Sequence, residues 1–211
     1  MMKYYVIAGE ASGDLHGANL IKALRKRDPD AEIRCWGGSK MEAAGAHLRK
    51  HYKDLAFMGF WEVILNLRTI LKNFRFAEAD LMDFKPDVLI LIDYPGFNLR
   101  LAKFAHQQGF RIAWYISPQL WAWKAGRVEQ IKRFVDRMMV ILPFEKSWYA
   151  QHQVPVDFVG HPLIDELEKR PKNLDFKTRN QLDDRPIVAL LPGSRKQEIA
   201  QMLPVYLSMP Q

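Results

Sequence analysis

The sequence has almost no cysteine and no long hydrophobic run. Cys35 is the only cysteine among 211 residues, which excludes an internal disulfide and any cysteine-rich zinc or iron–sulfur site. The longest clean apolar runs, residues 88–92 and 138–142, have the length of β-strands, whereas a membrane-spanning helix needs roughly 18 such residues. The start reaches Gly9 too soon to supply the apolar segment of a signal peptide, so we expect a cytoplasmic protein that does not span a bilayer.

Convincing metal-binding patterns are missing as well. His47 and His51 stand four residues apart and could share one face of a helix, but their basic neighbours Arg49 and Lys50 indicate a solvated surface instead. We therefore expect no metal site. Charge, in contrast, is plentiful: 31 Lys and Arg against 24 Asp and Glu give a net charge of +7. This balance favours anionic partners such as nucleic acid, phosphorylated metabolites or an acidic membrane surface, without choosing among them.

Short apolar, β-branched runs alternate with longer amphipathic ones along most of the chain. This alternation is typical of an α/β protein that has a parallel sheet with helices on both faces. The expected strands are residues 3–8, 32–36, 87–92, 111–116, 137–142, 157–159 and 186–191. Helices are expected in most of the gaps between them.

A polar stretch divides the chain. Residues 165–185 are rich in charge and contain no clear strand, so we expect a first domain at 1–164 and a linker at 165–185. Residues 186–211 then supply an apolar strand, a Pro-Gly-Ser-Arg loop at 192–195 and the opening of a helix. One strand and one helix are not a domain, so this part is predicted to be the truncated start of a second one.

The loop at residues 9–14, Gly-Glu-Ala-Ser-Gly-Asp, follows the first predicted strand. Ligands of open parallel sheets bind beyond the carboxyl ends of the strands, where such loops lie. The two glycines allow close backbone approach, and the helix that follows offers free N–H groups to an anion or a sugar. The spacing matches neither the dinucleotide fingerprint nor the P-loop. The alternative is that Ser12 or Asp14 only caps the helix.

A second loop, residues 91–98, places Asp93 at the end of an otherwise apolar strand. Partial loss of hydration would raise the pKa of this carboxylate and suit it to act as general base toward a hydroxyl nucleophile. The alternative is a turn-forming aspartate before Pro-Gly, with Asn98 as cap of the next helix.

A third loop, residues 117–124, combines two tryptophans, an amide and a lysine. Aromatic faces stack on sugars and Gln119 can pair with hydroxyls, so the loop suits a wall for a sugar or acyl ligand. The alternative is that Trp121 and Trp123 belong to the core.

Residues 57–84 carry more apolar side chains than one buried helix face can use. One stripe, expected to face the core, is Phe57, Phe60, Ile64, Leu67, Leu71 and Phe74. A second stripe lies about a quarter-turn away and consists of Trp61, Leu65, Arg68, Lys72 and Arg75. With Met58, this stripe offers apolar insertion and attraction to anionic lipid, as an interfacial membrane helix does. The alternative is a wide core face with ordinary surface cations.

The motifs together resemble those of lipid-A-disaccharide synthases. The matching segments occur in the order of that family at residues 9–14, 58–62, 92–98, 117–123, 158–163 and 190–198. The resemblance covers the chain nearly end to end. It implies a GT-B glycosyltransferase with two Rossmann-like domains, of which the chain holds the first and the beginning of the second.

The resemblance also implies an activity. Family members are inverting, metal-independent glycosyltransferases without a cofactor, and they work at the cytoplasmic face of the inner membrane of Gram-negative bacteria. Their donor is UDP-2,3-diacylglucosamine, their acceptor is 2,3-diacylglucosamine 1-phosphate, and the products are the β-1,6-linked lipid A disaccharide 1-phosphate and UDP. The anionic acceptor and leaflet, rather than nucleic acid, then account for the basic balance. The second domain contributes to a homodimer in the full-length form.

The matching motifs assign roles to particular residues. Asp93 is expected to be the catalytic base and Arg195 to stabilise the departing UDP. The expected substrate-binding residues are Glu10, Ser12, Gly13, Asp14, Asn98, Gln119, Trp121, Gly193 and Ser194. The expected membrane-interface residues are Met58, Trp61, Leu65, Arg68, Lys72 and Arg75.

The chain departs from the family in length. Full-length members continue through a complete second domain that supplies most donor contacts, so the 211-residue chain alone is expected to be inactive and to bind UDP poorly. Two alternatives remain. The chain is a lipid-phosphate binding fragment at the membrane surface without catalysis, or it belongs to another two-domain UDP-sugar enzyme such as a UDP-N-acetylglucosamine 2-epimerase.

Overall fold

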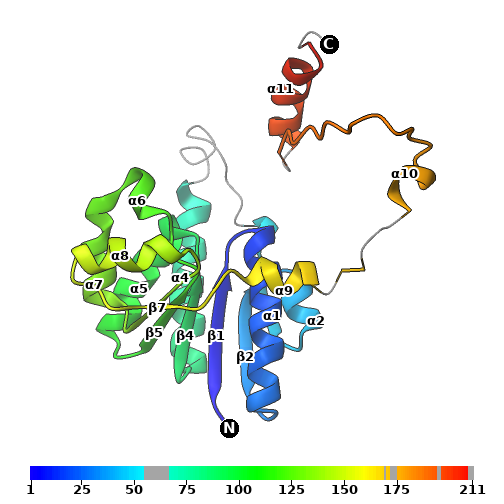
Figure 1. Ribbon diagram of the computed structural model, residues 1–211. Helices are drawn as coiled ribbons and strands as arrows, with labels where there is room; N and C mark the ends of the chain where they lie inside the picture. Colours follow the sequence, from blue (N-terminus) through cyan, green and yellow to red (C-terminus); the bar gives the residue numbers. More distant parts are fainter. Residues whose placement is uncertain (55–66, 169, 172–174, 194–195, 209–211) are drawn as a thin grey trace. The chain divides into compact units, whose positions relative to one another are not determined.

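One parallel sheet organises most of the chain. The computed structural model describes residues 1–54, 67–168, 170–171, 175–193 and 196–208, which fall into two compact units, Met1–Glu166 and Leu167–Gln211 (Figure 1). The first unit contains a seven-stranded sheet in the order β3-β2-β1-β4-β5-β6-β7, and every neighbouring pair is parallel. The strands are β1 (Lys3–Ala8), β2 (Glu32–Gly37), β3 (His47–His51), β4 (Val88–Ile92), β5 (Arg111–Tyr115), β6 (Arg137–Val140) and β7 (Val156–Phe158).

Helices cover both faces of this sheet, as the sequence predicts (Figure 1). One face carries α1 (Ala11–Arg27) and α2 (Ser39–Ala43). The other carries α4 (Leu67–Phe84), α5 (Pro95–Gln107), α7 (Val128–Phe134) and α8 (Pro143–Gln151). The remaining elements of the unit are α6 (Leu120–Trp123), two 3-10 turns, η1 (Tyr52–Asp54) and η2 (Ala125–Arg127), and most of α9 (Pro162–Glu168).

The core forms two layers because alternate strand residues point to opposite faces. In β1, Tyr5 and Ile7 pack with the layer under α4 and α5, whereas Val6 and Ala8 pack with the layer under α1. All four side chains are fully buried. Burial on both faces explains why the central strands are apolar without alternation.

The strand β3 was not among the strands predicted from the sequence, which left open that His47 and His51 share one face of a helix. Both histidines lie in this edge strand, paired with β2. Leu48 is the only aliphatic residue of the strand, and none of the five residues is fully buried. An edge strand has only one neighbour and needs no apolar run, so its sequence carries little strand signal.

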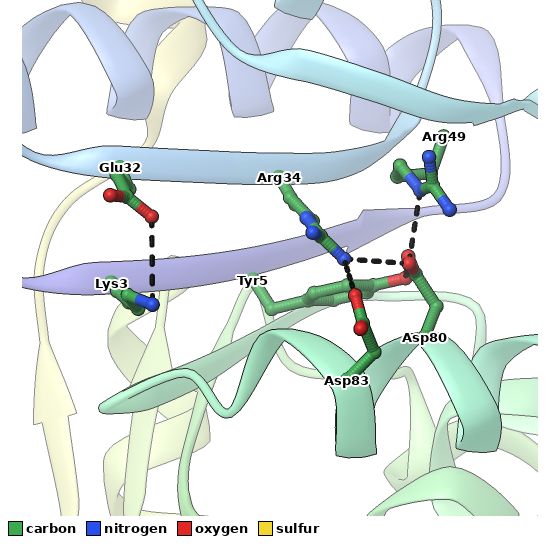
Figure 2. A network of polar contacts seen from close by, with 7 residues as sticks. All are labelled: Lys3, Tyr5, Glu32, Arg34, Arg49, Asp80 and Asp83. Carbon is green, nitrogen blue, oxygen red and sulfur yellow. Dashed lines mark hydrogen bonds and ion pairs between the residues drawn. The ribbon is translucent and has the colours of Figure 1, made fainter.

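A buried carboxylate ties α4 to the sheet (Figure 2). The Asp80 carboxylate accepts hydrogen bonds from the Tyr5 hydroxyl of β1, from Arg34 Nη1 of β2 at 2.8 Å and from Arg49 Nε of β3 at 3.0 Å. Asp83, one turn further along α4, pairs with the same Arg34 nitrogen at 2.8 Å. Three adjacent strands therefore fix the position of one helix.

The second unit contains two helices, α10 (Phe176–Arg179) and α11 (Lys196–Leu207). The helix predicted after the Pro-Gly-Ser-Arg loop is confirmed by α11. The strand predicted at 186–191 is wrong: these residues form no strand, and Val188 and Leu191 are each 82% exposed. A strand needs a hydrogen-bonding neighbour, and all seven strands of the described residues pair within the first unit.

Candidate active site at the carboxyl edge of the sheet

The strand order reverses between β1 and β4. After β1 the chain turns to α1 on one face, and after β4 it turns to α5 on the other face. Loops that diverge in this way leave a crevice at the carboxyl edge of the sheet, where open α/β folds bind ligands. The fold therefore brings the loop at 9–14 beside the loop that begins at Asp93, and the loop after β5 lies next to them.

The turn at the end of β4 has an unusual backbone. Asp93 and Tyr94 both have left-handed conformations, with φ of 43° and 49°, and Ile116 at the end of β5 has φ of 66°. Such conformations cost non-glycine residues about 1 kcal/mol or more each and cluster at functional sites. The Asp93 N–H donates to the Ile116 carbonyl over 3.2 Å, so the two strained turns hold each other in place.

The side-chain amide of Asn98 stabilises the same turn. Its Nδ2 donates to the carbonyl of Asp93 at 2.8 Å and to that of Ile92 at 3.3 Å, and the side chain is completely buried. The cap position of α5 is Tyr94, without a side-chain hydrogen bond, so Asn98 is not the helix cap that the alternative interpretation requires. The geometry makes Asn98 a residue that positions Asp93.

The pKa of the Asp93 carboxyl is raised to about 6. Burial by the surrounding loops is the main cause, the charge of Glu10 adds to it, and the backbone N–H of Tyr94 opposes it. The residue nevertheless reaches solvent on its open side. A carboxylate with this pKa is largely ionised at neutral pH and is more basic than an ordinary aspartate, as a general base requires.

The glycines of the first loop serve close packing. A Cβ on Gly9 would lie 2.4 Å from the Tyr94 ring, and one on Gly13 would lie 2.9 Å from the Ala8 Cβ. Gly9 therefore leaves room for the Tyr94 ring, and Gly13 lets α1 start close to β1. Glu10 is half-buried at the cap position of α1, and Ser12 is exposed. The cap position makes no side-chain cap hydrogen bond and Ser12 lies within the helix, so the capping interpretation is wrong for Ser12.

Asp14 lies in α1 but caps the start of a different helix, α2. The buried carboxylate accepts hydrogen bonds from the backbone N–H groups of Gly38 at 2.8 Å, Met41 at 3.0 Å and Lys40 at 3.2 Å. These groups belong to the start of α2, which follows β2. Asp14 therefore links two loops of the carboxyl edge. Its contribution to the site is to hold these loops in position.

The loop after β5 is anchored from inside and open on its outer side. Ser117 and Tyr149 of α8 are buried, and their hydroxyls are hydrogen-bonded at 2.7 Å. Burial raises the pKa of Tyr149 to about 12. Gln119 is exposed, and Trp121 is 36% exposed with its ring edge-on to Phe144 at 5.0 Å. Trp121 is thus not a core residue and is available to a ligand.

Several expected site residues lie outside the described residues. They are Met58, Trp61, Leu65, Ser194 and Arg195. Of the expected interface cations, Arg68, Lys72 and Arg75 all stand exposed on α4. Leu71 was expected in the core and is instead 41% exposed, whereas Phe74 is buried as predicted.

Gly193 belongs to the second unit and precedes the first residue of α11, Lys196, by three positions. Its φ of +100° favours glycine, and an added Cβ would lie 2.5 Å from an oxygen of Glu198.

Sequence reasoning missed four residues that shape the site: Tyr94, Ile116, Ser117 and Tyr149. The glycine at position 9 was the one local signal, because glycine permits another group to approach the backbone closely. The strain at Ile116 and the Ser117–Tyr149 pair depend on contacts between distant segments, and nothing local in the sequence announces them. Among the helices that the structure describes, none combines the length and hydropathy needed to cross a membrane.

Solved structures with a similar fold identify the class. A UDP-GlcNAc 2-epimerase from Methanocaldococcus jannaschii matches with a TM-score of 0.60 and 15% identity over 85% of this chain and 54% of that one. A UDP-N-acetylglucosamine 2-epimerase described as putative, from Listeria monocytogenes, matches with a TM-score of 0.61 and 11% identity over 84% and 50%. At such identity the likeness shows the fold alone: a Rossmann-like α/β domain of the GT-B kind.

The sequence identifies the family within that class. The chain belongs to the lipid-A-disaccharide synthetase family, whose sequence model matches residues 4–210. Lipid-A-disaccharide synthase of Trichlorobacter lovleyi is 46% identical over 203 residues, which are 96% of this chain and 53% of that protein. The one from Koribacter versatilis is 44% identical over 208 residues, covering 97% and 54%. The resemblance drawn from the motifs is confirmed, and the chain spans about half the length of these relatives.

Proposed function

We propose that the complete protein to which this chain belongs is a lipid-A-disaccharide synthase. It transfers 2,3-diacylglucosamine from UDP-2,3-diacylglucosamine to 2,3-diacylglucosamine 1-phosphate, giving the β-1,6-linked disaccharide 1-phosphate and UDP. The observation that carries the proposal is the placement of Asp93, with its raised pKa, at the switch point of a chain that belongs to this family.

The chemistry assigns each group a step. The Asp93 carboxylate takes the proton of the acceptor 6-hydroxyl as that oxygen attacks the donor anomeric carbon. The bond from that carbon to the UDP oxygen breaks, and UDP leaves with the electron pair. Arg195, with the backbone of Gly193 and Ser194, stabilises the charge that develops on the diphosphate.

The remaining residues bind or position the substrates. Glu10, Ser12, Gln119 and Trp121 line the acceptor side at the mouth of the crevice. Gly13, Asp14 and Asn98 hold the loops that present them.

The proposed location is the cytoplasmic face of the inner membrane, with attachment through the surface of α4. Three exposed cations, Arg68, Lys72 and Arg75, support it, since basic residues on an amphipathic helix attract anionic leaflets. Met58, Trp61 and Leu65 supply the apolar insertion. The complete protein is proposed to form a homodimer through its second domain.

The test is an assay of the complete protein with both lipid substrates. The proposal expects one UDP for each disaccharide 1-phosphate formed. Conversion of UDP-N-acetylglucosamine to its 2-epimer, without disaccharide, would favour the epimerase alternative instead. Vesicle binding without either reaction would favour a lipid-phosphate binding protein.

A further inference from the structure

A groove runs between α4 and α5, away from the crevice. The two helices lie side by side on the same face of the sheet (Figure 1). Residues three or four apart on each helix line the groove: Leu71, Phe74, Arg75 and Glu78 from α4, and Arg100, Lys103, Phe104 and Gln107 from α5. This spacing places each set on one helix face. The groove encloses about 480 Å³, enough for a small headgroup.

The floor of the groove is apolar and partly open. Phe74 is buried, Phe104 is half-buried, and Leu71 is 41% exposed. The Arg100 guanidinium lies 4.6 Å from the centroid of the Phe74 ring, which holds the cation at the rim. Leu71 is a large apolar side chain, and its exposure to water is unfavourable. The floor therefore suits the aliphatic part of a ligand.

The rim of the groove is basic. Arg75, Arg100 and Lys103 are all exposed, and Glu78 is the single acidic residue among the lining side chains. Within the part of the chain that the structure describes, none of the three cations forms an ion pair. The excess of positive charge over an apolar floor is complementary to a phosphate that is attached to an apolar body.

We propose that this groove binds the phosphate headgroup of an anionic glycerophospholipid at the bilayer surface. The three cations bind the phosphate, while the glycerol and the first methylenes of the chains cover Leu71 and Phe104. The lining residues of α5 lie five to twelve residues beyond its start, roughly 8–18 Å along the helix from the turn at Asp93. The groove is therefore separate from the crevice and would hold a lipid of the membrane itself. This inference rests on the proposed attachment of the protein through α4.

The first experiment measures binding of the 211-residue chain to vesicles. Vesicles of phosphatidylcholine alone are compared with vesicles that contain about one-third phosphatidylglycerol. The double variant Arg100→Gln/Lys103→Gln is expected to bind the anionic vesicles about 30-fold more weakly, because each cation near the surface contributes about a factor of five. The matched control is Lys22→Gln/Lys26→Gln, which removes two exposed cations from α1 on the opposite face.

The second experiment locates the lipid. Because Cys35 is completely buried, a fluorophore reacts selectively with a new cysteine in the variant Gln107→Cys or, as control, Lys26→Cys. Lipids with a nitroxide on the headgroup are expected to quench the label at position 107 and not the label at 26. Adding Arg100→Gln/Lys103→Gln should abolish that quenching.

Three results would overturn the inference: no binding to anionic vesicles, equal weakening by the α1 control, or a label at 107 that stays bright on bound protein. Release of the chain from vesicles by millimolar glycerol 3-phosphate would instead assign the groove to soluble phosphates. Transfer activity is measured separately on the complete protein. Failure of transfer with intact headgroup binding would therefore refute the proposed reaction and leave the groove standing.

Discussion

At the scale of single residues, the site depends on how neighbouring loops change one carboxylate. Burial raises the pKa of Asp93, and the charge of Glu10 raises it further. Asn98 and the Ile116 carbonyl hold the backbone of the same turn. The basicity and position of the Asp93 carboxylate therefore depend on three loops and not on Asp93 alone.

Replacing Glu10 with Gln should lower the pKa of Asp93. A negative neighbour disfavours the carboxylate, so its removal stabilises the charged form and moves the titration below pH 6. The measurement is a carbon-13 NMR titration of the Asp93 carboxyl in the chain. Glu32→Gln, at the amino end of β2 and the far edge of the sheet, should leave the titration unchanged. A pKa that stays at about 6 in the Glu10→Gln variant would contradict the assigned cause.

Replacing Gly9 with Ala should destabilise the first unit by about 1–3 kcal/mol, since the new methyl overlaps the Tyr94 ring. The free energy of unfolding in urea measures the loss. Gly96→Ala is the matched control, because its Cβ meets nothing within 4 Å. Equal stability of the two variants would show that Tyr94 does not need the space at Gly9.

At the scale of elements, the position of α4 is fixed by charge as well as by apolar packing. Asp80 joins three strands to this helix, and its side chain is only 2% exposed. The same helix carries the exposed cations and one wall of the groove. The buried end of α4 thus orients the surface that we assign to the membrane.

Asp80→Asn should lower the free energy of unfolding by about 3 kcal/mol, because two arginines and a buried tyrosine lose their charged acceptor. Asp83→Asn is the control within the same network, since that side chain is 69% exposed and its ion pair is screened by solvent. Urea unfolding of both variants checks the contrast. A loss in the Asp83 variant as large as in the Asp80 variant would refute the role given to burial.

Elements could be predicted from the sequence where burial leaves an apolar run. The central strands β1 and β4 are buried on both faces along most of their length, and their ranges follow from their sequences. The edge strand β3 has no such run and was missed. Residues 186–191 have the apolar sequence of a strand but lack a partner among the described residues, so pattern alone gave the wrong answer.

At the scale of the whole molecule, the sheet order determines where the site lies. Residues 9–14, 93–98 and 117–124 are far apart in sequence, and their common position after parallel strands predicts that they meet. Which atoms touch could not be predicted. The capping of α2 by Asp14 and the bond from Asp93 to Ile116 depend on the packing of distant segments.

The central claim is that Asp93 is the base of a sugar transfer, and Asp93→Asn in the complete protein tests it most directly. An amide cannot accept the proton, so the transfer rate at saturating substrates should fall by about 10²–10⁴-fold while the chain remains folded. Arg195→Ala, measured beside it, should also slow transfer. Near-normal rates in both variants would contradict the account.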